Sequence, residues 1–159
     1  MATVLAHLAR MRGLQVLMPY WVLGLVLLVW FFSPWLLLAV VYGMILQFLF
    51  EYVLHRFAYH GEPPTDQSGF SKLYRTHRAH HEFPTDPRFF TGDAPWWGFR
   101  VAALFAFVHF LAALPFLGAG TAAVFATSTI FVGGISAFLF YEYCHTLAHL
   151  NVPKGPFGK

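Results

Sequence analysis

The most informative shortage in this sequence is charge. Only 11% of its 159 residues are Asp, Glu, Lys or Arg, whereas soluble domains carry about 25%. Hydrophobic residues make up 58% of the chain and aromatic residues 19%. This composition excludes an ordinary water-soluble domain and favours a membrane protein. The net charge of +3 is also too small to indicate binding to nucleic acid.

Cysteine is nearly absent as well. Cys144 stands alone, so the chain forms no intrachain disulfide, and we interpret this residue as a small apolar side chain. Histidine, by contrast, occurs nine times. A metal site in this chain would therefore be built from imidazoles rather than thiolates.

Charge is missing from two long runs, residues 13–50 and 101–141. One helix needs about 20 apolar residues to cross a bilayer, so each run is long enough for two crossings. Ser33-Pro34 predicts the turn in the first run, and Pro115 with Gly118-Ala119-Gly120 predicts the turn in the second. We expect one all-α membrane domain over residues 1–159, with four transmembrane helices arranged as two hairpins, near 16–32, 34–50, 99–116 and 121–141.

All charged residues fall on one side of this arrangement. The ten basic residues are Arg10, Arg12, Arg56, Lys72, Arg75, Arg78, Arg88, Arg100, Lys154 and Lys159. The seven acidic residues share that side, and the two opposite turns carry no charge. The positive-inside rule then predicts a multi-pass protein whose two termini and 51–98 segment are cytoplasmic. We expect a short amphipathic helix over 69–82, which makes this segment a histidine-rich cap.

Seven of the histidines form three clusters beside the apolar runs: His55 and His60; His77, His80 and His81; His145 and His149. On a helix, the i, i+3 and i+4 positions of the second cluster share one face, as do the i and i+4 positions of the third. The five-residue spacing of the first separates its members by about 140°. They would share one metal only if the helix is distorted; otherwise they would face two metals.

Metal ligation would give these imidazoles the polar partners that groups near a bilayer need. Seven ligands exceed the three or four of a zinc site and suit two ions. An all-histidine shell fits iron, zinc or copper equally well. Glu51, Glu142 and Asp86 are candidates to orient the ligands by accepting their second ring proton. We interpret His7 and His109 as ordinary polar residues with local partners.

Three motifs together carry a family resemblance: Glu51-Tyr-x2-His55-Arg-Phe-x2-His60, His77-x2-His80-His81-x2-Pro84-x-Asp86 and Tyr141-Glu142-x2-His145-x3-His149. With its four expected spans, the chain resembles the membrane fatty acid hydroxylase and sterol desaturase superfamily, and within it the fatty acid 2-hydroxylase-like branch. The resemblance implies two iron ions, with zinc as a substitute in purified samples, held by all seven clustered histidines.

The implied reaction is hydroxylation of a lipid acyl chain with dioxygen and two electrons. The resemblance also implies a groove between the spans for a membrane lipid and an external electron donor, either a ferredoxin-like or a haem protein. Relatives continue into a further His-x2-His-His cluster, whereas this sequence stops at Lys159. We therefore expect the C-terminal part of the domain to be truncated. Leu150 also replaces a second histidine that many relatives have.

Two alternatives remain open. The same ligands would serve a sterol or carotenoid substrate, or a desaturase. A non-catalytic membrane protein that binds or transports metal would instead place ligands along a path through the spans. Only His109 lies within an expected span, which argues against transport.

Overall fold

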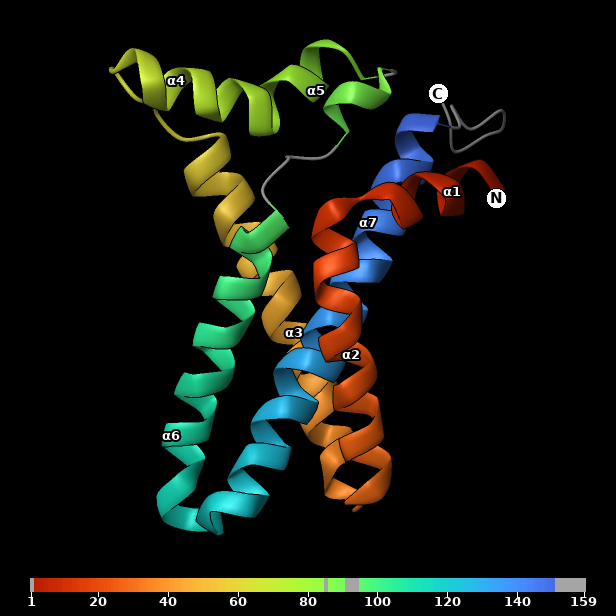
Figure 1. Ribbon diagram of the computed structural model, residues 1–159. Coiled ribbons are helices and arrows are strands. Elements are labelled where there is room, and N and C mark those ends of the chain that lie inside the picture. The colour runs from red at the N-terminus through yellow and green to blue at the C-terminus, as the bar shows by residue number, and fades with distance from the viewer. Residues whose placement is uncertain (1, 85, 91–94, 151–159) are drawn as a thin grey trace, which may run out of the picture.

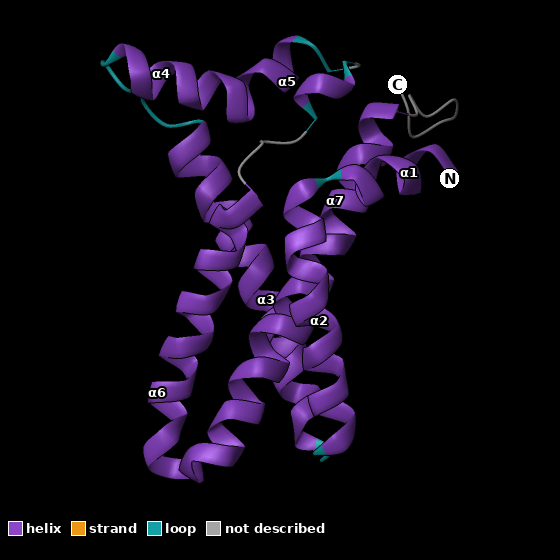
Figure 2. Cartoon of the chain, viewed as in Figure 1, coloured by secondary structure: helices purple, strands orange, loops and turns teal. Residues whose placement is uncertain are grey.

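A computed structural model describes residues 2–84, 86–90 and 95–150 of the chain, and every regular element in these ranges is helical (Figures 1 and 2). The α-helices are α1 (Ala2–Arg10), α2 (Arg12–Trp30), α3 (Trp35–Val53), α4 (Gln67–Leu73), α5 (Ala79–Glu82), α6 (Pro95–Thr127) and α7 (Ile135–Leu150). Three π-helical segments, η1 (Leu54–Tyr59), η2 (Tyr74–Arg78) and η4 (Ser128–Gly134), and the 3-10 turn η3 (Pro87–Phe89) complete the described part.

Three apolar stretches are long enough to cross a membrane: Arg12–Trp30, Trp35–Tyr59 and Trp96–Leu150. Large apolar side chains stay exposed along them, and Phe116 is 85% exposed. In a bilayer such side chains would face lipid rather than water. The helices are consistent with a membrane protein, as the composition predicted.

The chain reverses where proline and glycine predicted it. α2 ends at Trp30 and α3 begins at Trp35, so the first turn includes Ser33-Pro34. The third stretch is helical throughout except at Gly118, whose φ of 71° and ψ of 163° are not helical. A side chain is rarely tolerated at that φ, so glycine allows the bend. Figure 1 shows the chain turning there and returning through η4 into α7.

Helices α3 and η4 pack unusually closely. A Cβ atom added to Gly43 would overlap the Thr129 carbonyl group, and one added to Gly133 would overlap the Val40 carbonyl group. Small residues that let two backbones approach are typical of helix contacts within membranes. This contact fixes α3 against the returning chain and so sets the relative positions of η1 and α7.

The 67–82 segment forms one helical rod, α4–η2–α5, which lies across one end of the bundle (Figure 1). Its start is two residues earlier than predicted because Asp66 caps it, accepting a hydrogen bond from the Gly69 N–H at 2.7 Å. No residue of α4 is buried, and in α5 the buried residues are Ala79 and His80. We call this rod the cap.

Candidate metal centre

The seven clustered histidines gather into two groups where the cap meets η1 and α7. The first group consists of His55 from η1, His60 from the residue that follows η1, and His77 and His81 from the cap. Their ligand atoms all lie within 4.8 Å of one another. Successive Nε2 atoms are 3.1 Å apart from His55 to His60, 3.0 Å from His60 to His77 and 3.1 Å from His77 to His81.

A π-helical turn explains how His55 and His60 meet. The His60 N–H donates to the His55 carbonyl at 3.0 Å, so five residues complete one hydrogen-bonded turn. An ideal α-helix would have held the two rings about 140° apart. Of the two possibilities that the sequence left open, the structure has the distorted helix, with both rings facing one place.

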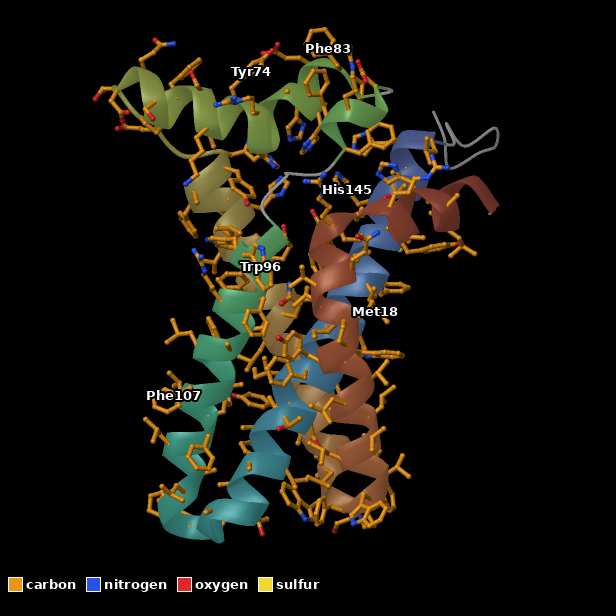
Figure 3. The ribbon with its side chains drawn as sticks, viewed as in Figure 1. Met18, Tyr74, Phe83, Trp96, Phe107 and His145 are labelled. Carbon is orange, nitrogen blue, oxygen red and sulfur yellow. The ribbon has the colours of Figure 1, made fainter. Side chains whose placement is uncertain are left out.

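The second group joins His80 of the cap to His145 and His149 of α7. The His145 and His149 Nε2 atoms are 3.0 Å apart, as the i, i+4 spacing predicted. His149 Nδ1–H donates to the Pro84 carbonyl at 2.6 Å, which leaves Nε2 as the nitrogen with a free lone pair. In Figure 3 His145 lies where α7 meets the cap.

His77, His80 and His81 are neighbours on the cap, with ring centroids 4.3–4.9 Å apart. They nevertheless divide between the two groups: His77 and His81 contribute to the first, and His80 to the second. The one helix face predicted from the spacing therefore contributes histidines to two separate groups.

The three candidate orienting acids differ in their partners. Glu142 Oε2 lies 3.7 Å from His145 Nδ1, close but longer than a hydrogen bond. Glu51 has the Tyr141 hydroxyl as its hydrogen-bond partner. Asp86 instead accepts hydrogen bonds from the Arg88 guanidinium and the Arg88 N–H at 3.0 Å. Of these three acids, Glu142 is the one found within ion-pair distance of a clustered histidine in the described part of the chain.

A cavity of about 720 Å³ begins at the two groups and continues into the bundle. His77 of the first group and His80 and His145 of the second line it. Farther in, its walls include Leu14, Leu46, Phe50, Phe105, Ile130 and Phe138. Both histidine groups therefore border one apolar chamber of a size that takes a single small-molecule ligand.

Comparison with known proteins identifies the family. A family model described as fatty acid hydroxylase matches residues 40–158, about three quarters of the chain. This chain belongs to the fatty acid hydroxylase family. The match includes all seven clustered histidines, whereas α1 and α2 precede it.

Two curated relatives support the fatty acid 2-hydroxylase-like branch of the family. The chain is 30% identical to fatty acid 2-hydroxylase from Rattus norvegicus over 120 residues, 74% of this chain and 29% of the relative. It is 29% identical to the Macaca fascicularis protein of the same name over 113 residues, 70% of this chain and 27% of the relative. The chain thus spans less than a third of these relatives, and no solved structure matches it.

The histidine geometry of this fatty acid hydroxylase chain suits metal ligation. Two nitrogens that each lie about 2.1 Å from one ion are about 3.0 Å apart when the ion binds them at right angles, as in octahedral coordination. The Nε2 spacings of 3.0–3.1 Å match that value in both groups. The carbonyl bond at His149 Nδ1 further resembles the contact that usually orients a ligating imidazole.

The protonation state of the histidines also favours ligation in this family member. Burial, with the neighbouring imidazoles, lowers the pKa of His77 to about 3 and that of His80 to about 4. Both rings are therefore neutral near pH 7, which is the form that binds a metal.

These low pKa values predict acid instability of the metal-free chain. Unfolded histidine takes up a proton near pH 6.5, whereas folded His77 and His80 do not until about pH 3–4. Unfolding therefore binds protons in this window, and the free energy of unfolding falls as the pH drops from about 6.5 to 4. The thermal midpoint in detergent should show that slope. His77→Gln should flatten it, and an equal slope in both proteins would contradict the assignment.

Some neighbours of the site carried no sequence signal. The Tyr59 ring stacks on His77 at 4.4 Å, and the fully buried Phe90 stacks on His149 at 4.9 Å. Tyr59 occupies an unspecified position of the first motif and Phe90 lies outside all three motifs, so only the tertiary structure identifies them. His7 was expected to have a local partner, and that prediction is wrong: its buried Nε2 has no hydrogen-bond partner among the described residues.

Proposed function

We propose that this chain hydroxylates the acyl chain of a membrane lipid, using two iron ions held by its two histidine groups. One observation carries the proposal: histidines of both groups border the same apolar cavity. An acyl chain inside that cavity would have its carbons beside both groups. The fatty acid hydroxylase family match supports hydroxylation as the reaction.

Each group would hold one ion through its imidazoles. His55, His60, His77 and His81 would bind the first, and His80, His145 and His149 the second. When bound, iron supplies the redox chemistry through which one atom of dioxygen enters a C–H bond and the other leaves as water, consuming two electrons and two protons. The electrons would come from a ferredoxin-like or haem protein. Zinc would fill the same sites without that chemistry, because it has no redox activity.

The protein's own residues would bind the acyl chain, shield it from water and orient the histidine rings. Phe50, Phe105 and Phe138 line the cavity and would hold the acyl chain by removing its surface from water. The Pro84 carbonyl fixes the tautomer of His149, and Glu142 is placed to stabilise the Nδ1 proton of His145. Tyr59, stacked on His77, restricts that ring.

The proposal includes an orientation in the membrane. The helices would cross the bilayer four times as two hairpins, because the third apolar stretch bends at Gly118. The charged cap and both histidine groups would then face the cytoplasm. A lipid tail would enter the cavity from the bilayer without passing through water.

The test is product analysis with the full chain in lipid vesicles, loaded with Fe²⁺ and given a fatty acid, a chemical reductant and ¹⁸O₂. We expect a hydroxylated fatty acid with one labelled oxygen atom. The His80→Ala variant should form none of this product. The His109→Ala variant should still form it, because His109 lies within α6 and belongs to neither histidine group. Full activity of the His80→Ala variant would refute the site. An unsaturated product would mean that the chain catalyses desaturation and not hydroxylation.

A further inference from the structure

The cavity has a basic lining at its cap end, supplied largely by the N-terminal segment. Arg10, Arg12, Lys72 and Arg88 all border it there, together with His7. The deeper walls, from the middle of α2, α3 and α6, contribute no charged residue. Three of these five residues belong to α1 and the start of α2, which precede the residues matched by the family model.

Arg10 and Arg12 are placed together by a break in the helix. Met11 between them has an extended backbone, with φ −68° and ψ 113°, so α1 turns away from α2 and residues on both sides of the break line the cavity. Neither guanidinium has a carboxylate within ion-pair distance in the described part of the chain. Arg88, by contrast, is paired with Asp86.

His7 adds a second, independent observation. It lines the same end of the cavity, and its Nε2 is buried with no hydrogen-bond partner in the described residues. Its ring packs against Phe90, which also stacks on the His149 ring. Buried polar atoms normally have a partner, so His7 indicates a polar group that enters from the cavity.

We propose that His7, Arg10 and Arg12 form a binding site for the anionic head group of a single-chain acyl lipid, either a carboxylate or a phosphate. This inference rests on the proposed function, since it places the acyl tail in the same cavity. With the head group beside α1, the carbons nearest the head would lie at the histidine end of the cavity, which His80 and His145 line. The site would therefore select charged lipids and favour reaction close to the head group.

The acidic residues of the cavity support this placement. Glu51 and Glu142 line the cavity from α3 and α7, where Glu142 faces His145 and Glu51 bonds Tyr141. Carboxylates there would repel an anion, whereas the unpaired guanidiniums beside α1 attract it. The head group would therefore bind at the unpaired guanidiniums and away from these two carboxylates.

The test is equilibrium binding of radiolabelled palmitate, its methyl ester and a monoacylglycerol phosphate to the full chain in neutral detergent. We expect the acid or the phosphate to bind at least about tenfold more tightly than the ester, with the difference shrinking in high salt. Arg10→Gln and Arg12→Gln should each weaken anion binding about fivefold and leave ester binding unchanged. His7→Leu should weaken it also.

Arg100→Gln is the matched control, because Arg100 is exposed near the same end but does not line the cavity. Arg10→Lys, which keeps the charge, should retain most of the affinity and so separates head-group binding from folding. Equal affinity for acid and ester, or unchanged palmitate affinity in the Arg10→Gln, Arg12→Gln double variant, would overturn the site. Binding needs no turnover, so charge-selective binding without hydroxylated product would refute only the proposed function.

Discussion

His77→Ala should lower the bound metal from two ions to one per chain and reduce hydroxylation at least about 100-fold. Changes beside a metal ligand already cost about 10- to 100-fold in affinity or activity, and loss of a ligand should cost more. His77 belongs to the four-histidine group, and its Nε2 contacts those of both His60 and His81. His145→Ala should remove the other ion, because His145 belongs to the three-histidine group. Mass spectrometry of the metal content of purified protein gives the counts.

The double variant His77→Ala, His145→Ala should retain no ion. His109→Ala should keep two, because His109 bonds the Phe105 carbonyl far from both groups. Loss of both ions from either single variant would mean that the seven histidines form one shared site. Retention of both would mean that the substituted histidine is not a ligand.

Gly43→Ala should lower the thermal midpoint of the protein by roughly 5–10 °C. The added methyl group would overlap the backbone of Thr129, which cannot move aside as a side chain can. Forcing extra volume into such a contact costs about 1–3 kcal/mol, and about 1 kcal/mol shifts the midpoint by 2–4 °C in a protein of this size. Gly133→Ala should behave alike, because it meets the backbone of Val40 across the same contact. Thermal unfolding in detergent measures both.

Gly120→Ala is the matched control. A Cβ atom there has no neighbour within 4 Å, so the midpoint should stay within about 1 °C. A large decrease for Gly120→Ala as well would mean that alanine disturbs these helices generally. No decrease for Gly43→Ala would contradict the close packing of α3 on η4.

The sequence predicted the helices and turns well because their causes are local. The two uncharged runs predict apolar helices. Pro34 and Gly118 interrupt them because proline cannot continue a helix and glycine tolerates a positive φ. Helix α3 runs directly into η1, so the chain stays helical past the expected span 34–50 as far as Tyr59. Four crossings and a cytoplasmic cap stay predictions.

The histidine motifs predicted which residues would gather, but not how they would divide. The separation of His80 from His77 and His81 depends on where η1 and α7 approach the cap, and no local spacing encodes that. The pairing of His55 with His60 needed a π-helical turn, whose hydrogen bond does not follow from residue type. Asp86 was a candidate orienting acid, yet Arg88, two residues away, is its partner. That local competitor was visible in the sequence.

The cap has little apolar core of its own, so its attachment to the bundle depends on a few side chains. Its buried side chains are chiefly His77 and His80, and each reaches a different part of the bundle. Bound ions would therefore act as two cross-links, one from the cap to η1 and one from the cap to α7. A chelator would then release the cap as a separately unfolding unit while the bundle persisted. In such a protein, metal supply would control access to the cavity as well as its chemistry.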